Sequence, residues 1–247
     1  MPEPRRRVLV AAGNSGLGLG LLDRLFDDGT YDLVATYRRA PNGLMEKFAA
    51  RGLDPKRNVL RADLTNYDEV QAAVSQAAAG GPLWGIVNLA GTASAQRLAK
   101  MDPADLRTVL LDGCLTAMYL TKAGIDAFNS NGLGGGRMIL MSSVTVRRVV
   151  PGVAAYNAAK ARVEGLVHAA AEELGRSGST INALRLGYFD AGMSAQVPQA
   201  ILDRVVAGTA SHRLGSSHDL ASAVRHLLGP DAAFINGSVL ELDGGLM

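Results

Sequence analysis

The sequence predicts an α/β fold in which a parallel sheet of about seven strands is covered by helices on both faces. Short apolar runs alternate along the chain with longer segments of helical period. The apolar runs are nearly continuous, which is typical of parallel strands buried on both faces. With 247 residues, of which 48% are hydrophobic, the chain is long enough to bury one large core.

The individual elements follow from this pattern in chain order. Runs rich in Val, Leu and Ile predict strands over residues 6–12, 31–37, 58–64, 84–90, 137–143, 180–186 and 238–244. Segments with apolar residues three or four positions apart predict helices over residues 19–28, 43–52, 67–79, 104–128, 154–174 and 217–228. The glycine clusters at 80–81 and 134–136 indicate loops rather than linkers, so we expect one doubly wound domain over residues 1–247.

Composition argues against several classes of protein. The sequence has no apolar run of about 18 residues, so we expect no membrane span. Its formal charge is only +2 and its basic residues are scattered, which argues against a nucleic-acid partner. A single cysteine, Cys114, excludes an internal disulfide, and the histidines lack the spacing of metal ligands. We therefore expect a soluble cytoplasmic protein without a metal site.

The candidate catalytic residues lie around the end of the fifth predicted strand. Ser143 ends that strand, Tyr156 lies in the next helix, and Lys160 follows Tyr156 on the same helix face. A phenol has an unperturbed pKa of about 10, and a neighbouring cation makes its proton easier to release. A serine hydroxyl at the strand end can hold the carbonyl oxygen of a substrate in front of that phenol. These three residues suit a reaction in which a carbonyl oxygen is protonated while hydride reaches the carbonyl carbon. The alternative interpretation is that Tyr156 and Lys160 are surface residues of an ordinary amphipathic helix.

A glycine-rich turn follows the first predicted strand. The sequence AAGNSGLGLG leads from the strand into a helix, whose N-terminus is where a dinucleotide pyrophosphate would bind. Gly16 and Gly18 have the spacing needed for close backbone approach and for packing of helix on strand. Many α/β folds use such a turn, so it does not identify the ligand by itself.

Together these motifs resemble those of the short-chain dehydrogenase/reductase family, especially its branch of 3-oxoacyl-(acyl carrier protein) reductases. The family's TGxxxGxG corresponds to residues 11–18, its NNAG to residues 88–91, its adenine-contacting Asp to Asp63, its Ser and YxxxK to Ser143, Tyr156 and Lys160, and its final RLG-to-DGG segment to residues 213–245. The resemblance covers the chain from about residue 7 onward. It implies a single-domain doubly wound Rossmann fold that binds a nicotinamide cofactor.

The resemblance also assigns roles to individual residues. It implies that Ser143, Tyr156 and Lys160 are catalytic. The cofactor site that it implies comprises Ala12, Gly13, Asn14, Ser15, Gly16, Leu17, Gly18, Arg38, Arg39, Asp63, Leu64, Asn88, Ala90, Gly91, Tyr156, Lys160, Gly187 and Phe189. A mobile substrate lid is expected at about residues 188–212. A homotetramer is expected as well, because the alanine-rich helices 104–128 and 154–174 would allow close packing across a two-fold axis.

The end of the second predicted strand bears on cofactor choice. NAD-specific relatives place an acid there, but this chain has Tyr37 at that position, followed by Arg38 and Arg39. Arginine attracts the 2′-phosphate that an acid would repel. NADP(H) is therefore favoured, and a pair of solvated arginines is the alternative.

Several positions depart from the family pattern. Leu89 replaces the second Asn of NNAG, and Ala191 replaces a threonine that often meets the cofactor carboxamide. Gly113 stands where the family has a catalytic asparagine that supports a water beside the lysine. A water in the vacated space and Asp112, after a slip of register, are the two candidate substitutes.

Two functional classes stay open. The first is an NADPH-dependent ketoreductase that acts on a 3-oxoacyl thioester, carried by acyl carrier protein or coenzyme A, or on a polyketide-like carbonyl. The second is a Rossmann protein that has lost turnover and serves as a nucleotide-binding regulator or scaffold. The intact Ser143, Tyr156 and Lys160 favour the enzyme. Arg147 and Arg148, between the catalytic strand and helix, are candidates for contact with an anionic substrate handle, with a solvated loop as the alternative.

Overall fold

The protein is built around one seven-stranded sheet. The computed structural model describes residues 5–92, 95–148 and 150–246. Its strands are β1 (Arg6–Ala11), β2 (Tyr31–Tyr37), β3 (Val59–Arg61), β4 (Leu83–Asn88), β5 (Arg137–Ser143), β6 (Thr180–Leu186) and β7 (Val239–Leu242). They lie in the order β3-β2-β1-β4-β5-β6-β7, and every neighbouring pair is parallel. The predicted parallel sheet is confirmed, and the strand order reverses between β1 and β4, where open α/β sheets bind ligands.

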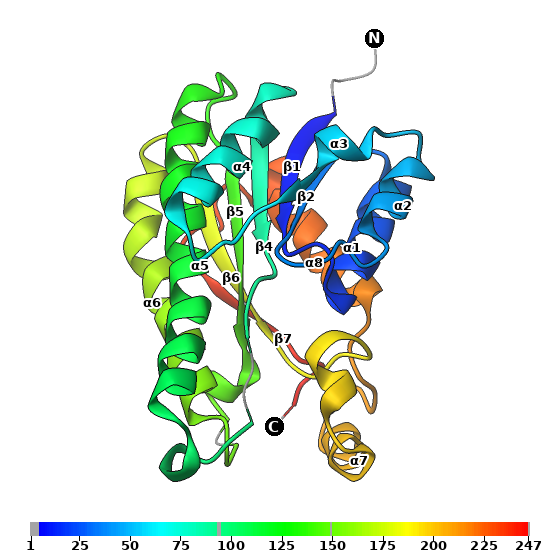
Figure 1. The fold of residues 1–247 in the computed structure, drawn as a ribbon, viewed down its shortest axis with the longest axis vertical. Helices are drawn as coiled ribbons and strands as arrows, with labels where there is room; N and C mark the ends of the chain where they lie inside the picture. The colour runs from blue at the N-terminus through cyan, green and yellow to red at the C-terminus, as the bar shows by residue number, and fades with distance from the viewer. Residues whose placement is uncertain (1–4, 93–94, 149, 247) are drawn as a thin grey trace.

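Helices cover both faces of this sheet, as Figure 1 shows. One face carries α4 (Tyr67–Ala79), α5 (Pro103–Ser130) and α6 (Ala154–Gly175), and the other carries α1 (Gly16–Asp28), α2 (Leu44–Ala49) and α8 (Ser217–Leu228). These six correspond to the six predicted helices. No helix among the residues described is long and apolar enough to cross a membrane.

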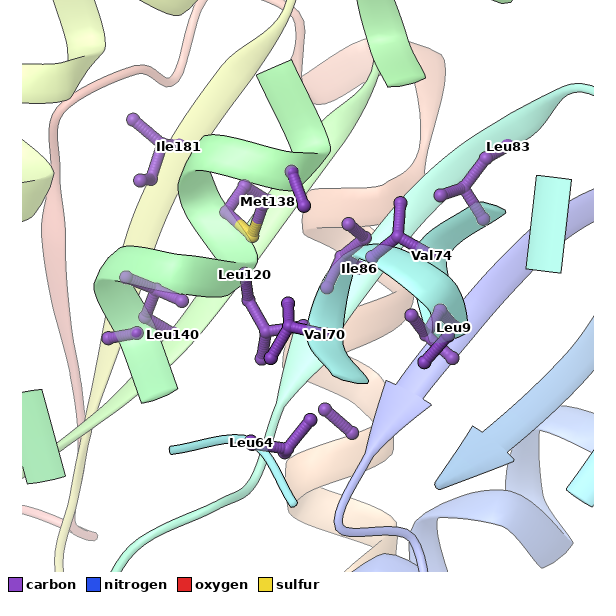
Figure 2. Packing of buried hydrophobic residues seen from close by; sticks show 14 of the residues in the cluster. Leu9, Leu64, Val70, Val74, Leu83, Ile86, Leu120, Met138, Leu140 and Ile181 are labelled. Carbon is purple, nitrogen blue, oxygen red and sulfur yellow. The ribbon is translucent and has the colours of Figure 1, made fainter. Parts of the chain in front are cut away.

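The core is divided by the sheet into two layers. In β1, Leu9 packs into the layer beneath α4, α5 and α6, whereas Val8 and Val10 pack into the opposite layer, and all three are fully buried. Figure 2 shows the first layer, in which Leu120 and Val70 lie between the sheet and its covering helices. Successive side chains of a strand point to opposite faces, so a strand covered on both faces is apolar at every position.

Polar side chains fix where the helices begin. The Ser15 hydroxyl accepts a hydrogen bond from the Gly18 amide at 3.0 Å and thereby caps α1. Asn66 caps α4, Asp102 caps α5, and Ser216 forms a capping box with α8. A cap of this kind contributes about 1 kcal/mol. At α1 it also sets the direction in which the glycine-rich turn enters the helix.

Two helices of the structure were not predicted. They are α3 (Pro55–Asn58) and α7 (Gln199–Ala207). α3 is a single turn, too short to show helical periodicity. α7 does have apolar residues at helical spacing, such as Ile201 and Val205, but the structure buries none of its residues. Figure 1 shows α7 away from the sheet, beyond the ends of the strands. It lies within the segment expected to be the lid.

Candidate active site

The glycine-rich turn lies at the carboxyl end of β1. Ala12 has φ of 58°, a left-handed conformation that costs an alanine about 1 kcal/mol and a glycine almost nothing. The Thr36 hydroxyl accepts the Ala12 amide at 3.0 Å and holds this conformation. A Cβ on Gly18 would come within 2.6 Å of the Gly13 carbonyl oxygen. Only glycine at position 18 therefore lets α1 start this close to the turn.

A cavity of about 240 Å³ opens beside this turn. Its lining includes eight of the residues predicted for the cofactor: Ala12, Asn14, Arg38, Arg39, Asp63, Leu64, Ala90 and Gly91. One oxygen of Asp63 accepts hydrogen bonds from the Thr65 amide and hydroxyl, at 3.0 and 2.8 Å. Burial tends to raise the pKa of Asp63, but these bonds and the nearby Arg38 hold it below its ordinary value. The cavity therefore presents a carboxylate as well as arginines.

A second cavity, of about 130 Å³, brings the three predicted catalytic residues together. Ser143 reaches it from the end of β5, and Tyr156 and Lys160 reach it from α6. Five further residues predicted for the cofactor also line it: Ser15, Leu17, Gly91, Gly187 and Phe189. Gly91 lines both cavities, and a Cβ there would lie 3.1 Å from Lys160 Nζ. The two cavities therefore meet at a glycine, where a side chain would crowd the lysine.

The remaining predicted residues shape the site from behind. Asn88 ends β4, and its Oδ1 accepts the Ala90 amide at 2.9 Å, which fixes the turn after the strand. A Cβ on Gly13 would lie 2.9 Å from the Ala35 Cβ in β2. A Cβ on Gly16 would come within 2.8 Å of a backbone nitrogen in the expected lid segment. These positions set how closely the turn, the sheet and the lid segment approach one another.

Burial dominates the electrostatics of the catalytic pair. Burial raises the pKa of Tyr156, and a hydrogen bond with the Ser143 hydroxyl partly offsets this rise. Burial lowers the pKa of Lys160 to about 8, so most molecules still carry the charge at pH 7. Lys160 Nζ donates to the Met141 carbonyl oxygen at 2.8 Å and lies 5.8 Å from the centre of the Tyr156 ring. Desolvation of the phenol is thus the largest influence on the tyrosine pKa, which lies above its ordinary value.

Gly113 lies on α5 where that helix touches α6. A Cβ at Gly113 would come within 2.8 Å of the Ala159 Cβ, so the helices have closed over the space that a side chain would need. Asp112 lines the first cavity, whereas Lys160 lines the second. Its carboxylate accepts the Thr92 hydroxyl at 3.2 Å and pairs with Arg38 at 3.4 Å. Lys160 Nζ is bonded to the Met141 carbonyl oxygen instead, so this arrangement does not support Asp112 as the substitute for the asparagine.

A buried ionic network beside the catalytic residues was missed in the sequence. Glu164 lies one helical turn beyond Lys160 and is 8% exposed. Its carboxylate accepts the Ser142 hydroxyl at 2.5 Å and two nitrogens of Arg185 at 2.9 and 2.7 Å. Arg185 also reaches Glu241 of β7 at 2.6 Å. The network joins β5, α6, β6 and β7 directly behind the site.

A family model described as enoyl-(acyl carrier protein) reductase matches residues 11–247, nearly the whole chain. This matches the motifs and the geometry given above. The chain belongs to the short-chain dehydrogenase/reductase family. The resemblance found in the sequence is thereby confirmed, and the chain is classed as an oxidoreductase.

Relatives of this short-chain dehydrogenase/reductase match it over nearly their full lengths. Acetoacetyl-CoA reductase of Allochromatium vinosum is 28% identical over 98% of this chain and 98% of its own. The 3-oxoacyl-[acyl-carrier-protein] reductase MabA of Mycobacterium tuberculosis is 29% identical over 99% and 94%. A crystal structure of actinorhodin polyketide ketoreductase with NADPH is 26% identical over 98% and 97%, with a TM-score of 0.88. All three names are names of reductases.

Proposed function

We propose that this chain is a cytoplasmic NADPH-dependent ketoreductase that reduces a ketone to an alcohol. The observation that carries the proposal is the cavity shared by Ser143, Tyr156 and Lys160, which meets the arginine-lined cavity at Gly91. The names of the relatives support a 3-oxoacyl thioester or a polyketide-like carbonyl as the substrate class.

The residues present fit a nicotinamide dinucleotide. Free amides at the start of α1 suit a pyrophosphate, and Arg38 and Asp63 would hold the adenosine end. Phe189 and Lys160 would hold the nicotinamide end, in the catalytic cavity. When bound, the reduced nicotinamide supplies the hydride.

The chain's own groups would handle the substrate oxygen and its proton. Ser143 Oγ accepts hydrogen bonds from the Thr145 hydroxyl and amide, at 3.0 and 3.3 Å, so its own proton is left to donate. That proton serves Tyr156 in this structure and would turn to the carbonyl oxygen of a bound substrate. The Tyr156 hydroxyl would then give its proton to that oxygen as negative charge develops. The charged Lys160 would stabilise the tyrosinate that remains.

Gly113 favours a second candidate function. With no side chain at this position, the family's asparagine-supported route for returning a proton to the tyrosine is missing. A chain that binds the dinucleotide without turning it over would serve as a regulator or scaffold. Loss of NADPH absorbance in the presence of ketones, β-ketoesters, diketones and acyl thioesters supports the enzyme. Binding of NADPH without turnover of any member of this panel supports the regulator.

We expect Arg38→Ala to weaken binding of NADPH about tenfold and to leave the affinity for NADH within twofold of the wild-type value. A charge-assisted hydrogen bond to a phosphate contributes about 1.5 kcal/mol, which corresponds to that factor. Calorimetric titration of both cofactors measures the two affinities. Arg57→Ala is a matched control, because Arg57 is exposed beside Asp54 outside both cavities. An equal loss for both cofactors would place Arg38 outside the phosphate site.

A carrier-bound substrate is part of the same proposal. Arg147 forms an ion pair with Glu241, whereas Arg148 is exposed on the loop after β5. Arg148 is therefore the better placed of the two to meet a phosphate of coenzyme A or of a carrier protein's prosthetic group.

Assembly as a homotetramer is also proposed, from an apolar surface on α5 and α6. Leu111 and Met118 are 36% and 47% exposed on α5, and Ala161 and Gly165 are exposed on α6. Light scattering at micromolar concentration should give about four times the chain mass of 25.8 kDa. A Cβ at Gly165 meets no atom within 4 Å, so Gly165→Glu should reduce the mass while the circular dichroism stays unchanged. A wild-type mass of one chain would contradict the assembly.

A further inference from the structure

The cavity of about 240 Å³ beside the glycine-rich turn, here called the adenosine-side cavity, contains Asp112, an acid that the sequence pattern does not place there. The described residues that line this cavity include four charged ones: Arg38, Arg39, Asp63 and Asp112. Two cations and two carboxylates sum to zero, although the end of β2 alone suggests a strongly basic pocket. Asp112 comes from α5, whereas the two arginines follow β2.

Asp112 is fixed in position, whereas Arg38 is the more accessible partner. The side chain of Asp112 is only 15% exposed, and its Oδ2 accepts the Thr92 hydroxyl at 3.2 Å. The Arg38 side chain is 42% exposed and brings Nη1 to 3.4 Å from the same oxygen. Asp63 Oδ1 lies 4.0 Å from that nitrogen. The Arg38 guanidinium is therefore attracted by two carboxylates, those of Asp112 and Asp63.

We propose that Asp112 is a specificity-determining residue that weakens discrimination in favour of the 2′-phosphorylated cofactor by competing with the phosphate for Arg38. This inference rests on the proposed cofactor role. A phosphate that binds Arg38 must take N–H donors that now face a carboxylate, whereas a 2′-hydroxyl carries no charge and needs no such exchange. Wild-type protein should therefore bind NADPH and NADH with affinities that differ by less than about tenfold.

The test uses Asp112→Asn, which keeps the size of the side chain and an oxygen that can accept from Thr92. The probes are adenosine 2′,5′-bisphosphate and 5′-AMP, titrated by calorimetry so that no turnover is needed. We expect the variant to bind the bisphosphate roughly tenfold more tightly and 5′-AMP within twofold of wild type. Asp126→Asn removes the same charge from an exposed position of α5, and it should leave both affinities unchanged.

A double-mutant cycle separates competition from general repulsion. In the Arg38→Ala background, Asp112→Asn should change bisphosphate affinity less than threefold, because the contested cation is gone. Three results would overturn the role of Asp112. They are an equal gain in bisphosphate affinity in both backgrounds, an unchanged ratio of bisphosphate affinity to 5′-AMP affinity, and weaker bisphosphate binding by Asp112→Asn. Failure of the wild-type protein to bind either probe or either cofactor would instead refute the proposed function itself.

Discussion

Tyr156→Phe should lower kcat by a factor of roughly 10² to 10⁴, the range that one positioned general acid supplies. The substitution removes only the hydroxyl, so the ring keeps its packing against Val109 and Ala155. Binding of NADPH should stay within a few-fold of wild type for the same reason. Steady-state kinetics with a saturating ketone measure the first quantity, and calorimetry measures the second.

Tyr119→Phe is the matched control for this result. Tyr119 lies on α5, where its ring packs edge-on against Tyr67 with centroids 5.4 Å apart, and it lies outside the catalytic cavity. The same chemical change there should leave kcat unchanged. Lys160→Ala should lose both activity and cofactor binding, which separates its role from that of Tyr156. Wild-type turnover by Tyr156→Phe would show that another group donates the proton.

Glu164→Ala should lower the free energy of unfolding by about 3 kcal/mol, because removing one member of a buried ion pair leaves its partner uncompensated. The side chains of Glu164 and Arg185 are 11% and 13% exposed, so water compensates little. For a chain of this length the change corresponds to a loss of roughly 6–12 °C in Tm. Thermal unfolding followed by circular dichroism measures it.

The loss of stability caused by Glu164→Ala should become smaller at acidic pH. Burial tends to raise the pKa of Glu164, but the bonds from Arg185 and Ser142 hold it below the ordinary value of 4.5. Its stabilisation is therefore present above pH 4.5 and is lost as the pH falls through the lowered pKa. Glu172→Ala on the same helix removes an 80%-exposed carboxylate paired with Arg176 and should cost at most about 0.5 kcal/mol. Equal losses for the two variants would contradict a stabilising network.

The sheet and most of its covering helices could be predicted because they depend on pattern. A strand buried on both faces is apolar throughout, and a covering helix shows an apolar stripe, so local sequence carries both signals. The predicted site residues around Ser143 and Arg38 do line the two cavities. Motif spacing located them because the carboxyl ends of parallel strands meet at one edge of the sheet.

The features that were missed depend on contacts between distant segments. Glu164 interrupts the apolar face of its helix, and Arg185 interrupts an apolar strand; each is an anomaly whose partner is visible only in the fold. Asp112 likewise looks like one acid on a long helix until the fold brings it to Arg38. Pairing of two buried charges across elements leaves no periodic signal, so such anomalies are the best available indication from sequence.

Because a Cβ at Gly113 would come within 2.8 Å of the Ala159 Cβ, an asparagine fits at that position only if the surrounding structure shifts. An asparagine there would force α5 and α6 apart, and their buried residues, such as Leu120 and Val163, would lose packing. An engineer who wants an amide or a hydroxyl beside Lys160 would therefore do better to place it at another position around the lysine than at Gly113.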